Sequence, residues 1–156
     1  MVTGMDLICT GKSWTRSRGI SSKGKSIMAN WDITHGHYNI DKQMQHRDLV
    51  NSVVHWFLGR YAMNRKSADQ HRILHVNLKT YKAMKCWGEC SEGDDGIDYN
   101  IDIATDQSLR DFIATLMHEL VHVLQWERGS WKGEGEREAT ELQYELADDF
   151  WRCGNV

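Results

Sequence analysis

His118, Glu119 and His122 form the pattern H-E-x-x-H within the segment HELVH, and this spacing is suited to a hydrolytic metal site. Side chains four residues apart share one face of a helix, so both imidazoles can reach a single metal ion. Glu119 can then reach a water on that ion and act as the general base. A chance match in a chain with 8 His is the alternative, with two ordinary histidines on a surface helix. We expect zinc-dependent hydrolysis, because the flanking sequence agrees with the motif.

The residues around the motif place it in the middle of a helix. This helix is predicted to begin at Ser108, with Asp111 as the capping-box partner, and to end at Gly129, a common C-terminal stop. Apolar residues fill one half of its surface, whereas His118 and His122 lie on the other half. The histidines are therefore expected to face away from the side that builds the core.

Catalytic zinc normally has three protein ligands and an open position for water, so the motif needs a third ligand. No histidine follows His122 in the chain, which leaves an acidic residue. The segment after Gly129 predicts a last helix with a buried apolar stripe, and Glu138 borders that stripe at about the height of His122. Glu138 is therefore the predicted third ligand. Glu141 has the same height but points more toward solvent, and Glu145 lies deeper along the helix; both remain alternatives.

The rest of the chain predicts a mixture of helix and strand. Apolar residues recur with helical spacing over 41–63, and residues 73–78 suggest a strand. Apolar and polar residues alternate over 97–103, as expected for a half-buried strand. Glycines and acids at 86–96 indicate a loop between the two strands. The fold class is therefore predicted to be α+β.

The chain of 156 residues is expected to hold one domain, at 28–156. Residues 1–27 are rich in Ser, Gly, Lys and Arg, which predicts a flexible basic N-terminal arm, and Met28 is a candidate for the true start. Residues 19–26 (GISSKGKS) match the P-loop pattern but lack a convincing strand before them and a convincing helix after them. Nucleotide binding is therefore not expected.

Composition narrows the location and the partners. The formal net charge of -3 gives no overall signal for nucleic-acid binding. The chain has no apolar run of about 18 residues and no apolar core of a secretory signal near its N-terminus, which predicts a cytoplasmic protein without a membrane partner. A protein or peptide substrate is the expected partner.

Residues 98–149 resemble the short gluzincin-type metallopeptidases, including the compact ones encoded by bacteriophages and the peptidase domain of the ImmA/IrrE group. The resemblance lies in the alternating strand, the HELVH helix, a Trp-Lys-Gly turn at 131–133, and the sequence Glu-Arg-Glu-Ala at 136–139. It implies a compact zincin-like domain in which a small, mostly antiparallel sheet packs against the motif helix and a C-terminal helix that carries the third ligand. It also implies Zn²⁺ as the cofactor, Glu138 as its ligand, and the host cytoplasm as the location of a phage protein.

Further roles follow from the resemblance and from zinc-hydrolase chemistry. The strand at 98–103 is expected to line the cleft and to pair with an extended substrate. Tyr144, Tyr99 and His75 are candidate donors to the developing oxyanion. Asp148 or Asp149 is a candidate partner that orients a ligand histidine.

Three other readings of the sequence compete with a gluzincin-type peptidase. The first is a non-catalytic, zinc-stabilised binding or inhibitor domain, which would tolerate loss of Glu119. The second is an SprT-like protease associated with nucleic acid, although that group uses a third histidine downstream of the motif. In the third reading, the basic arm binds nucleic acid: its Lys and Arg side chains neutralise phosphates, and Trp14 stacks on a base.

Overall fold

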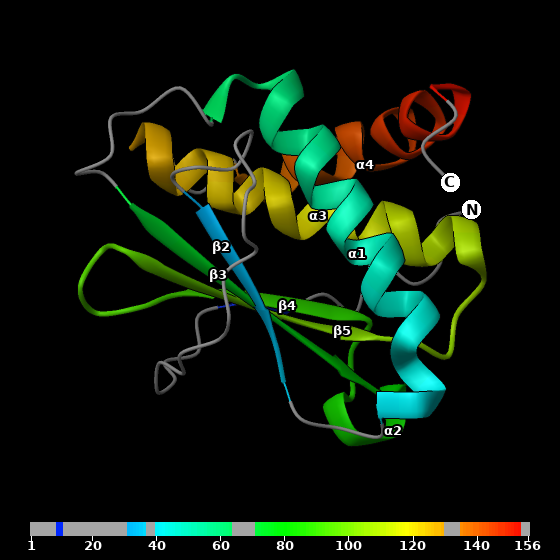
Figure 1. The fold of residues 1–156 in the computed structure, drawn as a ribbon. Helices are drawn as coiled ribbons and strands as arrows, with labels where there is room; N and C mark the ends of the chain where they lie inside the picture. The colour runs from blue at the N-terminus through cyan, green and yellow to red at the C-terminus, as the bar shows by residue number, and fades with distance from the viewer. Residues whose placement is uncertain (1–8, 11–30, 37–39, 64–70, 130–134, 154–156) are drawn as a thin grey trace.

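Three long helices lie on one side of a five-stranded sheet in the computed structural model, which describes residues 9–10, 31–36, 40–63, 71–129 and 135–153 (Figure 1). The strands are β1 (Cys9–Thr10), β2 (Trp31–His35), β3 (Arg72–Lys79), β4 (Gly88–Glu92) and β5 (Asp98–Ala104). The helices are α1 (Ile40–Arg60), the short α2 (Tyr81–Met84), α3 (Leu109–Arg128) and α4 (Gly135–Arg152). The predicted α+β class is confirmed.

The sheet is mixed, with the strand order β1-β4-β5-β3-β2. β4 and β5 form the one antiparallel pair among the described strands, and the other neighbours are parallel. The prediction of a mostly antiparallel sheet is therefore wrong. The cause is β4, which lies within 86–96, the segment expected to be a loop. The chain returns along β4 and reverses into β5, so β5 points in the same direction as β3 beside it.

β5 is the central strand of the sheet and is buried along its whole length. Its Ile101 lies opposite Cys90 of β4 on one side and Val76 of β3 on the other. Because both edges of β5 are paired, no edge is left to which an extended peptide could add. The predicted role of 98–103 as the strand that pairs with substrate is therefore wrong.

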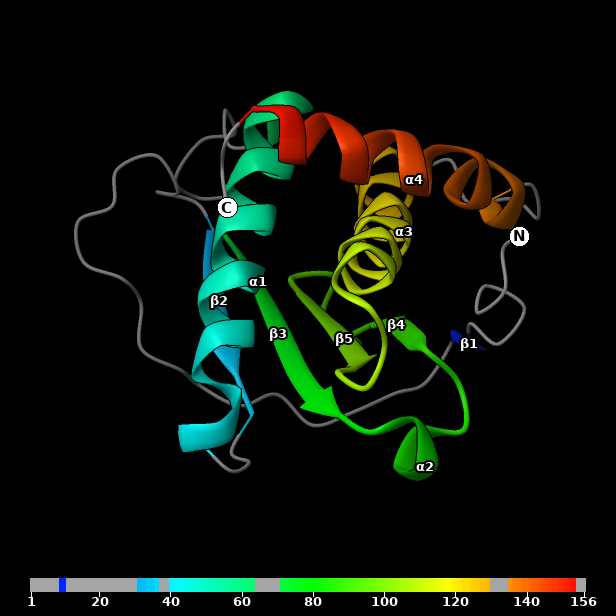
Figure 2. The ribbon, with the colours of Figure 1, turned by 90° about the vertical axis from the view of Figure 1, so that its right-hand side faces the viewer.

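α3 lies between the sheet and α4, as the view along its axis shows (Figure 2). Every residue from Phe112 to Gln125 is buried. The apolar half of the helix joins the main core, whereas the half that carries His118 and His122 is covered by α4. Both histidines are 0% exposed as a result. They are buried although they lie off the apolar half, because a second helix packs over them.

The ends of α3 match their prediction. Ser108 is the N-cap residue, and its hydroxyl accepts a hydrogen bond from the backbone N–H of Asp111 at 3.2 Å. Gly129 ends the helix in the left-handed conformation, with a φ of 67°, which glycine adopts without steric cost. The caps fix the length of the helix and therefore place the H-E-x-x-H segment near its middle.

The predicted basic arm at 1–27 falls mostly outside the described residues, as do the P-loop match at 19–26, Met28, Trp14 and the turn at 131–133. Two residues of the arm are described, and they form β1, which pairs with the outer side of β4. None of the described helices has both the length and the hydropathy to cross a bilayer.

Candidate metal centre

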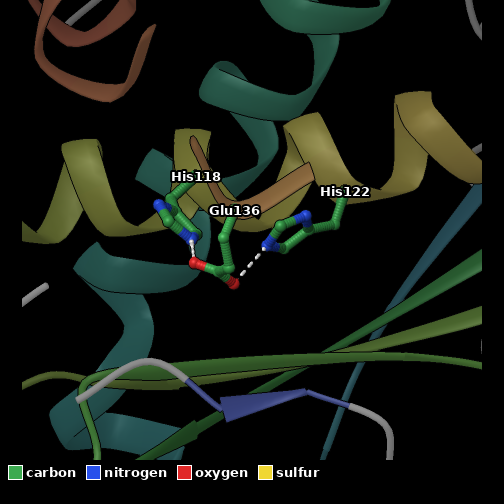
Figure 3. A group of neighbouring side chains, drawn as sticks. All are labelled: His118, His122 and Glu136. Carbon is green, nitrogen blue, oxygen red and sulfur yellow. Dashed lines mark hydrogen bonds and ion pairs between the residues drawn. The ribbon is translucent and has the colours of Figure 1, made fainter. Parts of the chain in front are cut away.

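The two motif histidines lie one turn apart on α3, with their Nε2 atoms directed toward the first turn of α4 (Figure 3). Their ring centroids are 4.9 Å apart, and the ring planes meet at 85°. This spacing follows from the helix itself, since residues four apart lie above one another on one face. Two imidazole nitrogens therefore converge on a single point beside the helix.

Glu136, on the first turn of α4, supplies the third donor. Its Oε1 lies 3.1 Å from His118 Nε2 and its Oε2 lies 3.1 Å from His122 Nε2. Within the described residues, these three side chains form a group whose ligand atoms all lie within 4.8 Å of one another. Ligands about 2.0 Å from a tetrahedral ion lie roughly 3.3 Å from each other, so the spacing fits a zinc-sized cation.

The electrostatics of the centre also favour a cation. Hydrogen bonds from His118 and His122 lower the pKa of Glu136 to about 2. The side chain of Glu136 is 50% exposed, so one side of the centre is open to solvent. A catalytic metal requires such an opening for water, whereas a structural site is usually closed by four protein ligands.

Two buried glutamines hold the far sides of the imidazole rings. Gln143 Oε1 lies 2.7 Å from His118 Nδ1, and Gln125 Oε1 lies 2.9 Å from His122 Nδ1. An amide oxygen only accepts, so each Nδ1 must donate its proton to the glutamine. Each Nε2 then lies next to a carboxylate oxygen of Glu136, and both atoms only accept hydrogen bonds. A metal ion or a second ring proton must therefore lie between them. The glutamines thus present both Nε2 atoms as ligands.

The structure does not bring Glu138 to the histidines. Its Oε1 instead accepts a hydrogen bond of 2.8 Å from Gln125 Nε2, and the ligand position predicted for it is taken by Glu136. The two alternative ligands are not part of the centre either: Glu141 is exposed beside Arg137, and Glu145 is also exposed. The physical reason is the way α4 packs on α3, which turns Glu136 toward the two rings and Glu138 toward Gln125.

Helical spacing could have indicated Glu136. Glu136 and Gln143 are seven residues apart, which puts them on the same face of a helix as the buried Ala139. Both side chains contact His118. The stripe predicted from sequence consists of Ala139, Leu142, Leu146 and Phe150, and Leu142 is the one member that is only partly buried.

Glu119 is fully buried, and neither of its carboxylate oxygens has a hydrogen-bond partner among the described residues. Burial raises the pKa of Glu119, and the nearby charge of Glu136 raises it further. A buried carboxyl group without a partner is costly, so its retention points to a ligand that is not part of the chain. A water on a metal at the centre would supply that partner. The donor set therefore fits a hydrolytic zinc ion.

The other predicted site residues have partners elsewhere. Tyr144 donates to Asp111, Tyr99 donates to Glu127, and His75 hydrogen-bonds with Thr34. Asp148 pairs with Arg110, and Asp149 pairs with Arg60 and Arg152. These pairs do not include His118 or His122. The Nδ1 atoms of the two histidines contact Gln143 and Gln125 instead.

Gly88, the first residue of β4, lies directly against the face of α3 that carries Thr115 and Glu119. A methyl group there would lie 2.6 Å from Thr115 Cγ2 and 3.1 Å from Glu119 Oε1. Thr115 is fully buried and branched at Cβ, so its methyl group has no free space into which to turn. β4 can therefore approach Glu119 this closely because residue 88 has no side chain.

We expect Gly88→Ala to destabilise the protein by about 1–3 kcal/mol, because the added methyl overpacks a closed contact. Thermal unfolding of the variant measures this loss. Gly59→Ala on α1 is the matched control, since a methyl there meets nothing within 4 Å and glycine is a poor helix former. A Gly88→Ala protein as stable as wild type would contradict the close contact.

Comparison of the chain with family models, with curated proteins and with solved structures gave no match. The resemblance to gluzincin-type metallopeptidases therefore has only the motif residues behind it. A function has to be inferred from the geometry of the centre.

Proposed function

We propose that the protein is a zinc-dependent peptidase of the gluzincin type, with His118, His122 and Glu136 as the metal ligands and Glu119 as the general base. One observation carries the proposal. Three donors converge on one point, and a fully buried carboxyl group without a partner lies on the same helix between the two histidines. The residue types in this arrangement are those that zinc hydrolases use.

His118, His122 and Glu136 would hold the zinc, which would supply a water with its pKa lowered toward about 7 and a Lewis acid for the carbonyl group. Glu119 accepts the proton of the attacking water and then passes it to the leaving amine. Its buried position suits this role, because desolvation raises the pKa of the carboxyl group and makes it a better proton acceptor. Gln143 and Gln125 keep the two rings in place during the reaction.

The half-exposed side chain of Glu136 favours this proposal over a non-catalytic, zinc-stabilised domain. A purely structural ion would gain from a fourth protein ligand, and the described residues supply three. The SprT-like alternative has less support, because the third donor is a glutamate rather than a histidine.

Metal analysis and hydrolysis assays on the purified protein test the proposal. We expect about one zinc ion per chain, cleavage of a denatured protein substrate, loss of cleavage after chelation, and recovery when zinc is added back. His118→Ala should lose both metal and activity, because it removes one of three ligands. A protein that keeps its zinc but cleaves no denatured substrate would fit the zinc-stabilised binding domain instead. Activity that survives complete removal of metal would refute the proposal.

A further inference from the structure

Gln125 connects the metal centre to the start of α4. It lies three residues after His122 on α3 and is 2% exposed. Its amide oxygen accepts from His122 Nδ1 at 2.9 Å, while its Nε2 donates to the carbonyl oxygen of Gly135 at 3.0 Å and to Glu138 Oε1 at 2.8 Å. One side chain thus contacts a ligand histidine on α3 and two residues on the first turn of α4.

The two acceptors at Nε2 fix the orientation of the Gln125 amide. A flipped amide would direct its oxygen at the Glu138 carboxylate and the Gly135 carbonyl, and three acceptors would then face one another. The observed orientation directs the oxygen at His122 Nδ1, which must carry the ring proton. His122 Nε2 is therefore held in the form that binds a metal.

The same amide also holds the third ligand in place. Gly135 is adjacent to Glu136 in the chain, so the hydrogen bond to its carbonyl fixes the point from which Glu136 reaches the two rings. Glu138, one turn into the helix, adds a charge-assisted bond to the same nitrogen. Two of the three ligands therefore depend on one buried amide.

We propose that Gln125 and Glu138 form a positioning pair for the metal centre. Glu138 sets the orientation of the Gln125 amide, and the amide sets both the ring of His122 and the approach of Glu136. This inference rests on the metal-binding part of the proposed function. It assigns Glu138 a role without making it a ligand.

The test uses variants in which an amide side chain is replaced by a carboxylate or the reverse. The zinc affinity of each variant is measured by competition with a chromophoric chelator. Gln125→Glu keeps an acceptor for His122 but replaces the donor, so its carboxylate repels Glu138 and the Gly135 carbonyl. We expect zinc to bind about 10–100-fold more weakly. Glu138→Gln should bind within a few-fold of wild type, because its amide oxygen still accepts from Gln125.

The double variant Gln125→Glu/Glu138→Gln provides the rescue. The new amide at position 138 donates to the new carboxylate at position 125, so most of the lost affinity should return. Glu141→Gln is the matched control, since it exchanges a carboxylate for an amide at an exposed position of the same helix as Glu138 and should leave zinc binding unchanged. Circular dichroism of each apoprotein separates weak binding from misfolding.

Two results would overturn the positioning pair: equal zinc affinity in wild type and Gln125→Glu, or no recovery in the double variant. A wild-type protein that binds no zinc would instead refute the proposed function itself. The two failures are therefore distinguishable within one set of titrations.

Discussion

Replacement of Glu119 by Gln is expected to lower the rate of peptide hydrolysis by about 10²–10⁴-fold while zinc remains bound. Glutamine has nearly the same shape, so the packing of the buried side chain is preserved, but it cannot accept the proton of water. Glu119 does not belong to the group of ligand atoms, so metal binding should not depend on its charge. Measurements of kcat/KM on samples of matched zinc content separate these two effects.

The Glu119 variant also has a distinctive effect on stability. Burial raises the pKa of Glu119, and both of its oxygens lack partners among the described residues, so a neutral amide removes the cost of burying an ionisable group. The apoprotein of the variant should therefore melt no lower than wild-type apoprotein. Glu141→Gln, an exchange of the same kind at an exposed position on α4, is the control and should change neither rate nor stability. Full activity in Glu119→Gln would remove Glu119 from the reaction.

The features that could be predicted from sequence are those encoded locally. α3 was predicted from a capping serine, a terminal glycine and a helical apolar period, and its observed ends agree with both caps. β3 was predicted from the apolar residues of 73–78, and β5 from the alternation of apolar and polar residues over 97–103. The spacing of His118 and His122 guarantees their convergence once the segment is helical. In each case a single continuous stretch of the chain carries the whole signal.

The features that were missed depend on contacts between distant parts of the chain. β4 has the sequence Gly-Glu-Cys-Ser-Glu, which shows neither apolar alternation nor β-branched residues. It forms a strand because β5 pairs with it on one side and α3 packs against Gly88. Without β4 the direction of β5 relative to β3 cannot be deduced, and the mostly antiparallel sheet was expected from the family resemblance alone.

The third ligand was missed for a related reason. Glu136 and Glu138 are two positions apart in the sequence, and only the packing of α4 against α3 decides which carboxylate reaches the rings. The local pattern could rank them by distance from an apolar stripe, but an error of one position in that stripe changes the order. The structure places Gln143 at its buried centre, which turns Glu136 toward His118 and leaves Glu138 beside Gln125.

Replacement of Glu136 by Gln is therefore expected to weaken zinc binding by more than the roughly 10–100-fold that loss of an outer partner costs. The variant keeps the length of the side chain but removes the anionic donor. Glu138→Gln is the paired comparison, because it makes the identical chemical change two residues along the same helix. Zinc titrations of the two apoproteins under one set of conditions give the difference directly.

The two zinc titrations show which carboxylate binds the metal, and hydrolysis assays provide a second measurement of the same loss. If Glu136 is the ligand, its variant loses zinc and hydrolysis together, while the Glu138 variant keeps both. If the loss follows Glu138 instead, α4 must turn by about 160° in the metal-bound protein, since two residues span about 200° of a helix. That rotation would pull Gln143 away from His118 and expose the buried Ala139 and Leu146. The cost of exposing this apolar face is the physical reason to expect that Glu136 binds the metal.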